Sequence, residues 1–195
     1  MRNYNAFRGA AVSLIREDSW GIYADGFKRA AELLISNVQS TYEINTVVFP
    51  ILFLCRHHIE LMLKEIIGYG LYLNQEVRTP PGGHDLQNLW KEAKAYIRKE
   101  ISDVSTDELE HIEHLILQMH ALDPTSEGSR YPVIRKRIQS GRNASFSWDS
   151  PHINLDELGD KMKTVGEFLH RVANFLSVAQ DLEAEFRADY YSYSY

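Results

Sequence analysis

Apolar residues are most concentrated between Ile44 and Asn74, the stretch around which the rest of the chain is expected to pack. Its first half, Val47 to Cys55, consists of nine consecutive residues that are apolar or Pro50. A membrane span takes about 20 apolar residues, so this shorter run predicts one end of a helix that protein buries on all sides. Ser40 and Thr41 are candidate N-caps, and Pro50 is expected to kink the helix rather than to start it.

The second half of this predicted helix carries a charged stripe. Arg56, Glu60 and Lys64 recur every four residues, which places them along one helix face. These side chains must be paired or hydrogen-bonded, because an unpaired buried charge is very costly. Two interpretations stay open from the spacing alone: a salt-bridge ladder, with His84 helping to start another helix, or a functional site.

Helical periodicity and capping residues predict the remaining elements. A short helix is expected from Ala6 to Glu17 and the first long helix from Ile22 to Val38, while the prolines and glycines of residues 77–83 predict a loop. Further along, Asp85 is expected to cap a helix whose apolar face is Leu86, Leu89, Trp90, Ala93, Tyr96 and Ile97. Ser105 and Glu108 have the spacing of a capping box, and the helix that follows has the apolar residues Leu109, Ile112, Leu115, Ile116 and Met119. Asn154 is expected to cap a last helix that runs to about Arg187. Residues from about 188 to 195 are expected to be frayed. The pattern predicts one all-α domain over residues 1–195, a bundle of four or five helices.

The composition changes before the last helix. No acidic residue occurs from Gly128 to Trp148, and this segment carries the cations Arg130, Arg135, Lys136, Arg137 and Arg142. Its β-branched residues and its Ser140-Gly141 turn signal predict a small irregular β-hairpin or an extended flap between Tyr131 and Phe146. A solvated face is one interpretation of the charge run, and contact with phosphate groups is the other.

Composition limits the broad class of the protein. The 195 residues are 44% hydrophobic and 25% charged, which is typical of a soluble globular domain. The single cysteine, Cys55, has no partner for an internal disulfide, and the N-terminus lacks an apolar signal segment, so we expect a cytoplasmic protein without a membrane span. The formal net charge of -6 argues against coating a long nucleic acid but leaves room for a local basic groove.

Three blocks of the sequence carry a resemblance to a known superfamily. They are Arg56-His57-x-Ile59-Glu60-Leu61-x-Leu63-Lys64, Gly83-His84-Asp85-Leu86-x-x-Leu89-Trp90 and Arg130-Tyr131-Pro132. Together they resemble a group of uncharacterised bacterial proteins similar to the HEPN superfamily, over roughly Ile44 to Pro132. The resemblance implies an all-α bundle, often a homodimer, that binds RNA or cleaves it without a metal or other cofactor in a phage-defence or toxin–antitoxin setting.

The usual HEPN signature is an Arg followed four to six residues later by His near the last core helix. Here only Arg78 and His84 have that separation, and they lie in the predicted loop, while the last helix has His170-Arg171 in the reverse order.

Metal-independent RNA cleavage needs a base for the ribose 2′-OH, an acid for the leaving 5′ oxygen and a cation for the phosphate charge. If the three blocks converge, the candidate catalytic residues are Arg56, His57, Glu60, His84 and Arg130. Glu60 would then hold the arginine or a histidine in place. The candidate phosphate-contacting residues are Arg78, Arg135, Lys136, Arg137 and Arg142.

Two alternatives belong to other functional classes. The first is a non-catalytic helical module that dimerises or docks a partner protein. The second is a di-metal carboxylate protein, since Glu108-x-x-His111 and Glu167-x-x-His170 have the spacing that such bundles use and Glu32 or Glu60 would complete the set. His111 and His114 also fit the solvated face of an acidic helix, and on balance no metal site is expected.

Overall fold

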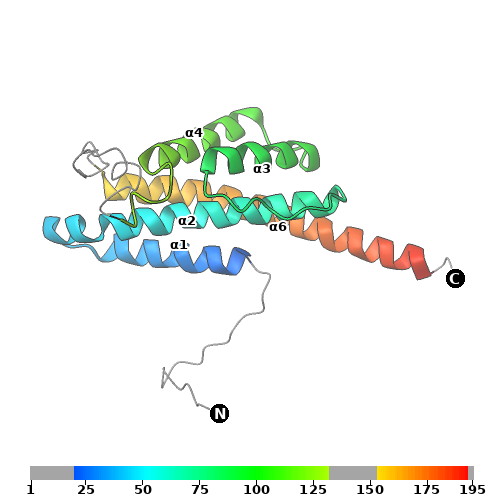
Figure 1. Ribbon diagram of the computed structural model, residues 1–195, viewed down its shortest axis with the longest axis horizontal. Coiled ribbons are helices and arrows are strands. Elements are labelled where there is room, and N and C mark those ends of the chain that lie inside the picture. The colour runs from blue at the N-terminus through cyan, green and yellow to red at the C-terminus, as the bar shows by residue number, and fades with distance from the viewer. Residues whose placement is uncertain (1–19, 132–152, 193–195) are drawn as a thin grey trace, which may run out of the picture.

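The structure, a computed structural model, describes residues 20–131 and 153–192. Within these residues it has five helices and no strand: α1 (Trp20–Asn37), α2 (Thr41–Leu73), α3 (Leu86–Glu100), α4 (Thr106–Leu122) and α6 (Leu155–Ser192). The predicted all-α bundle is therefore confirmed (Figure 1). The short helix predicted from Ala6 to Glu17 and almost all of the predicted hairpin or flap lie outside the described residues.

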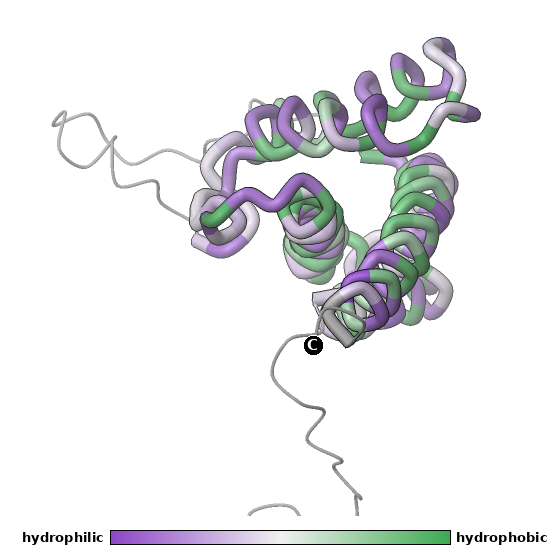
Figure 2. Tube along the Cα trace, turned by 90° about the vertical axis from the view of Figure 1, so that its right-hand side faces the viewer, coloured by the Kyte–Doolittle hydropathy of each residue, from purple (hydrophilic) through white to green (hydrophobic). Residues whose placement is uncertain are grey.

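Helix α2 is the central element, as its apolar sequence predicts. It packs against α1, α3 and α6, and Ile51, Ile59 and Ile66 on it are completely buried. Figure 2 looks along the bundle and shows the apolar positions of the helices turned mainly toward one another. Side chains that face the core from several directions explain why the pattern along α2 is apolar on more than one face.

The start of α2 follows from local chemistry. Ser40 is the N-cap, and its Oγ accepts a hydrogen bond of 3.3 Å from the backbone N–H of Glu43. The Glu43 carboxylate reaches back to the N–H of Gln39 at 2.8 Å. Pro50 lies well inside α2. It therefore does not mark the first turn of this helix, which agrees with the prediction that the helix starts before it.

By length and composition alone, α2 would pass for a membrane-spanning helix. The sequence prediction missed this because it considered only the nine-residue run from Val47 to Cys55. More than half of the most apolar window of α2 is buried inside the bundle, as in the core helix of a soluble protein.

Helices α3 and α4 form an antiparallel pair that covers one side of the bundle (Figure 1). Both predicted N-caps are confirmed: Asp85 accepts from the N–H of Asn88 at 2.9 Å, and Ser105 from the N–H of Glu108 at 3.1 Å. α3 approaches α2 closely, because the ring of Tyr96 occupies the space where a side chain on Gly70 would begin.

Helix α6 starts where the sequence predicts and ends later. Asn154 caps it by accepting from the N–H groups of Asp156 and Glu157 at 3.0 and 3.2 Å. The helix then continues to Ser192, past the predicted end at about Arg187. Its last turns run beyond the end of α2 (Figure 1), where no apolar core forces a periodic sequence.

Candidate functional site

A buried carboxylate on α2 lies at the centre of the candidate site. Glu60 is 1% exposed, and three side chains contact its two oxygens. Arg56 Nη1 donates to Oε2 at 3.2 Å, Lys64 Nζ donates to Oε1 at 2.8 Å, and His84 Nδ1 lies 2.8 Å from Oε1. The predicted ladder of Arg56, Glu60 and Lys64 is thus present, and His84 joins it from outside the helix.

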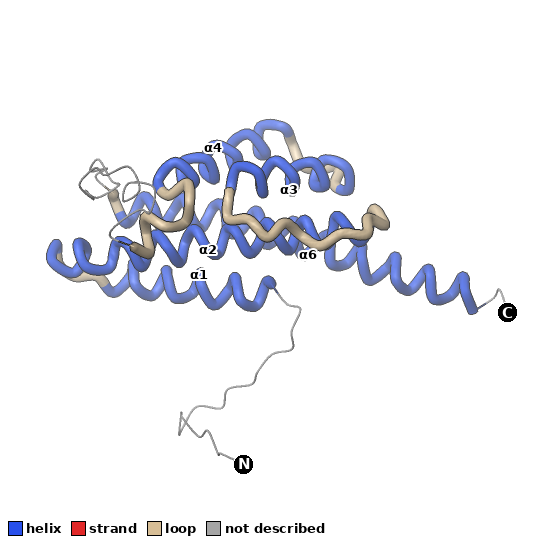
Figure 3. The backbone as a smooth tube through the Cα atoms, in the orientation of Figure 1, coloured by secondary structure: helices blue, strands red, loops and turns tan. Residues whose placement is uncertain are grey.

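The path of one loop explains how His84 reaches Glu60. After α2 ends, residues 74–85 run back along the bundle to the start of α3 (Figure 3). Pro80 lies 3.7 Å from the point where a Cβ on Gly68 would stand, so the loop follows the surface of α2. The Pro-Pro-Gly-Gly segment has few backbone N–H groups and no bulky side chains, which suits such a close approach.

Arg56 ties this loop to the far end of α4. Its Nε donates to the carbonyl oxygen of Asp123 at 2.9 Å, and its Nη2 donates to the carbonyl oxygen of His84. Burial lowers the pKa of Arg56, the nearby Asp123 and Glu60 oppose that effect, and the charge of Arg130 adds to the lowering. Each of its three nitrogens has a partner inside the protein, so Arg56 holds the site together instead of facing a ligand.

The neighbours of Glu60 keep it ionised. Burial on its own would raise the pKa of this carboxyl, but the neighbouring donors His57, Lys64 and His84 outweigh burial and bring the pKa well below its ordinary range. A permanently ionised carboxylate at this point fixes the orientation of the groups that donate to it.

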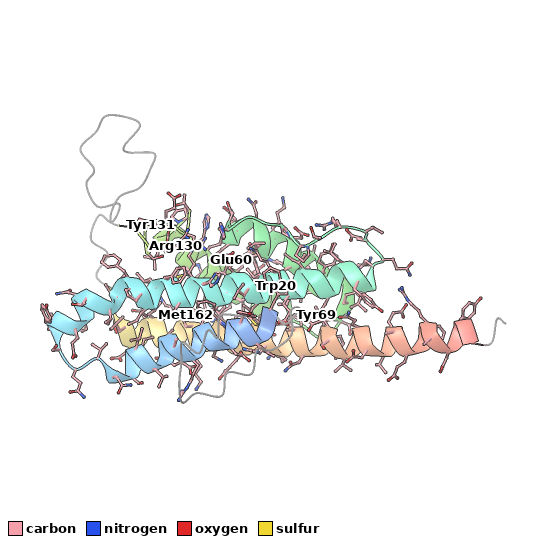
Figure 4. All side chains as sticks on the ribbon, turned by 60° about the horizontal axis from the view of Figure 1, so that its bottom comes forward. Trp20, Glu60, Tyr69, Arg130, Tyr131 and Met162 are labelled. Atoms are coloured by element: carbon pink, nitrogen blue, oxygen red, sulfur yellow. The ribbon has the colours of Figure 1, made fainter. Side chains whose placement is uncertain are left out.

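Arg130 lies near enough to the site for its charge to act on Arg56, and it stands in a loop that Asp123 organises. The Asp123 carboxylate accepts from the N–H groups of Gly128 and Ser129 at 3.0 and 3.1 Å and from Ser129 Oγ at 2.6 Å. Arg130 Nε donates to the carbonyl oxygen of Ser126, whose φ of 60° marks the tight turn. Figure 4 shows Arg130 and Tyr131 on the same side of the molecule as Glu60. Asp123 is not among the site residues predicted from the sequence, although an Asp before Pro at a helix end is a typical turn-forming signal.

His84 is the most exposed member of the cluster, with 55% of its side chain accessible. A carboxylate only accepts hydrogen bonds, so Nδ1 carries the proton that points to Glu60, and Nε2 on the opposite edge of the ring is left as an acceptor. His57 Nδ1 lies 4.0 Å from the other Glu60 oxygen, and its partly exposed ring packs between Phe27 and Phe53.

Other predicted site residues lie elsewhere. Arg78 donates to Glu92 at 2.7 Å and to Glu76 at 3.1 Å, and these carboxylates raise its pKa. Its charge is therefore already matched, which does not favour phosphate contact beside His84. The remaining predicted phosphate contacts, Arg135, Lys136, Arg137 and Arg142, lie outside the described residues.

The residues of the metal alternative have other partners. Glu108 accepts from Arg171, and His170 Nε2 lies 2.8 Å from Asp25. In residues 20–131 and 153–192, no three or more His, Cys, Asp or Glu side chains are grouped closely enough to hold a metal ion. The two Glu-x-x-His pairs therefore do not form a common site in this structure.

Comparison of the chain with known protein families, with curated proteins and with solved structures found no match.

Proposed function

We propose that this protein is a cytoplasmic, HEPN-like RNA-binding protein, with His84 as the acid–base group of a metal-independent cleavage site. The observation that carries the proposal is the pair formed by His84 and Glu60: a buried, ionised carboxylate orients an exposed imidazole by one nitrogen. Such pairing fixes the tautomer of a histidine and strengthens the other nitrogen as a base.

The roles follow from exposure and reach. Nε2 of His84 takes the proton of the ribose 2′-OH, whose oxygen attacks the neighbouring phosphorus. His57, the second imidazole at the same carboxylate, gives a proton to the leaving 5′ oxygen, and the products are a 2′,3′-cyclic phosphate and a 5′-OH. The Arg130 guanidinium stabilises the phosphate charge in the transition state. Arg56 and Glu60 are positioning residues.

The test is a paired assay of binding and cleavage on single-stranded RNA in the presence of EDTA. We expect His84→Ala to abolish cleavage and to leave binding largely intact, because a general base contributes more to the transition state than to ground-state affinity. We expect Arg130→Ala to weaken binding and to reduce its salt dependence, because one phosphate contact is lost. His111→Ala, an exposed histidine on α4, is the matched control and should match the wild type. Wild-type protein that neither binds nor cuts RNA would overturn the proposal.

A second function is favoured by a different observation, and we propose it as an addition to the first: the protein forms a homodimer through α6. Phe175, Val178, Leu182 and Phe186 follow one another at three- and four-residue spacing, and each is at least 50% exposed. A stripe of this kind is what two helices bury against each other. The occupant we assign to it is a second copy of this chain, and the oligomeric state in solution tests the assignment.

A further inference from the structure

A cavity of about 250 Å³ lies between α1, α2 and α6, away from the Glu60 cluster. Its wall is mainly apolar, and Lys28 and Lys163 contribute the cationic groups. The lining residues are Lys28, Ala31, Glu32, Ile35, Cys55, His58, Gly159, Met162 and Lys163. An apolar cavity of about 150 Å³ is already large enough to bind benzene, so this one accommodates a substituted aromatic ring.

His58 gives the cavity wall one unusual polar group. The side chain is completely buried, and its Nδ1 lies 3.0 Å from the carbonyl oxygen of Ala24. A carbonyl only accepts, so Nδ1 carries the proton and Nε2 is a hydrogen-bond acceptor. Nε2 has no hydrogen-bond partner in the part of the chain that the structure describes. A buried acceptor without a partner is costly, and a donor from a bound molecule would remove that cost.

Lys28 stands beside this acceptor. The Nζ atom of Lys28 and Nε2 of His58 lie 3.5 and 3.3 Å from the point where a Cβ on Gly166 would stand. Lys28 forms no ion pair within residues 20–131 and 153–192. One oxygen that both donates a hydrogen bond and accepts one satisfies the two groups together, and a hydroxyl is the simplest group of that kind.

The other polar groups do not change this chemistry. Burial raises the pKa of the Cys55 thiol to about 12, so it stays a protonated, weakly polar part of the wall. Burial also lowers the pKa of His58 to about 4, in agreement with a neutral ring that accepts through Nε2. Glu32 is half exposed and lies 3.6 Å from Arg29, at the solvent side.

We propose that this cavity binds a small aromatic alcohol or phenol, with the ring against Ile35, Cys55 and Met162 and the hydroxyl between His58 Nε2 and Lys28 Nζ. The hydroxyl hydrogen points to the imidazole, and the hydroxyl oxygen accepts from the ammonium group. The proposal concerns a site distinct from the RNA site, and either one can fail without the other.

The experiment compares two probes, 4-propylphenol and propylbenzene, which differ only in the hydroxyl. Saturation-transfer NMR and isothermal titration measure their binding to the full chain, and ¹⁵N-labelled histidine reports on His58. We expect 4-propylphenol to bind saturably at millimolar or lower concentration and about tenfold more tightly than propylbenzene, which is the size of one hydrogen bond to a buried acceptor. The Nε2 resonance of His58 should shift only with the phenol.

Three variants locate the site. His58→Asn keeps a donor for the Ala24 carbonyl and removes the Nε2 acceptor, so we expect it to lose the tenfold preference. Gly159→Leu fills the cavity from α6, where a Cβ meets Ile35 only at ordinary contact distance, and should abolish binding of both probes. Gly26→Leu is the same change on the exposed side of α1, where a Cβ meets no neighbour within 4 Å, and should leave binding unchanged.

Circular dichroism and thermal unfolding of each variant separate lost binding from lost folding. If Gly159→Leu does not fold, the preference lost in folded His58→Asn and the resonance shift decide the question. Equal affinity for the two probes, an unshifted His58 resonance, or no binding up to the solubility limit would overturn the proposal.

Discussion

Among single residues, Glu60 carries the greatest weight, because Arg56 and Lys64 are buried with it and depend on its charge. We expect Glu60→Ala to lower the free energy of unfolding by on the order of 2 kcal/mol or more, since it leaves uncompensated buried cations. Urea unfolding at neutral pH measures the change. Glu108→Ala is the control, because it breaks the exposed pair with Arg171 and should cost at most about 1 kcal/mol. Equal small losses in the two variants would show that the Glu60 cluster is not closed to water.

His58 predicts a dependence of stability on pH. Burial lowers its folded pKa to about 4, and His170 and Lys28 add to the lowering, while the hydrogen bond to Ala24 and the charge of Asp25 oppose it. The unfolded chain takes up this proton first, so stability falls as the pH drops below about 6.5 and the loss levels off near pH 4. Between pH 7 and pH 5 this group should remove about 2 kcal/mol from the free energy of unfolding.

Urea unfolding of the wild type and of His58→Asn at several pH values checks this expectation. The variant lacks the titrating ring and should lose about 2 kcal/mol less between pH 7 and pH 5. The lowered pKa of Glu60 affects stability only in more acidic solution, as the pH falls through and below the ordinary range of a carboxyl, so the two effects separate. Parallel pH profiles for the two proteins would contradict the assignment of a neutral, buried His58.

At the same scale, the sequence predicts what depends on helical spacing and misses what depends on the chain path. The ladder of Arg56, Glu60 and Lys64 follows from a four-residue repeat and is confirmed. That His84 joins this ladder could be proposed only from the resemblance, because the route of residues 74–85 leaves no periodic pattern. Helical spacing places His57, three residues before Glu60, on the face of the ladder, but nothing in the sequence indicates that His58 lines a cavity.

At the scale of elements, helix starts were predictable and helix ends were less so. Ser40, Asp85, Ser105 and Asn154 cap helices as expected, because capping is local chemistry between a side chain and the next turn. The predicted end of α6 came too early. The residues after Arg187 lie in the turns that extend beyond the bundle, so they carry no core-facing apolar pattern from which a helix could be predicted.

The contact between α2 and α3 gives a prediction at this scale. A Cβ on Gly70 would lie 2.2 Å from Cγ of Tyr96, so Gly70→Ala must push α3 away from α2 or displace that ring. We expect a loss of about 1–3 kcal/mol in the free energy of unfolding, as in other overpacked cores. Gly68→Ala is the matched control two residues earlier, where a Cβ would meet Pro80 at an ordinary 3.7 Å and Ala favours the helix. Thermal or urea unfolding compares the two, and an equal effect would mean that α3 adapts without cost.

At the scale of the whole molecule, the central place of α2 was predictable and the arrangement around it was not. A helix that is apolar on most faces has to be covered on most faces, which requires at least three neighbours. The loops decide which helices contact α2, and helical spacing does not predict the path of a loop. Periodicity also cannot distinguish a surface stripe from a core face, because a helix that packs against a second chain has the same apolar spacing as one that packs against its own core.

The stripe on α6 therefore leads to the last prediction. Together with Tyr190, its exposed side chains present on the order of 500 Å² of mainly apolar surface per chain, since an aromatic side chain alone has 150–250 Å². A standard interface buries about 800 Å² per partner, which the polar flanks of the stripe would complete. An isolated helix rarely keeps such a stripe in water, and the last turns of α6 extend past α2, where a second copy can approach (Figure 1).

We expect sedimentation velocity to give twice the chain mass of 22.5 kDa for the wild type and the mass of one chain for Leu182→Glu. A carboxylate at Leu182 would be desolvated without a partner in the dimer and exposed to water in the monomer, so it favours the monomer. Ala184→Glu adds the same charge at an exposed position on the opposite side of α6 and should remain a dimer. A wild type that stays monomeric at high concentration, or two variants that behave alike, would assign the stripe to another partner and remove the homodimer.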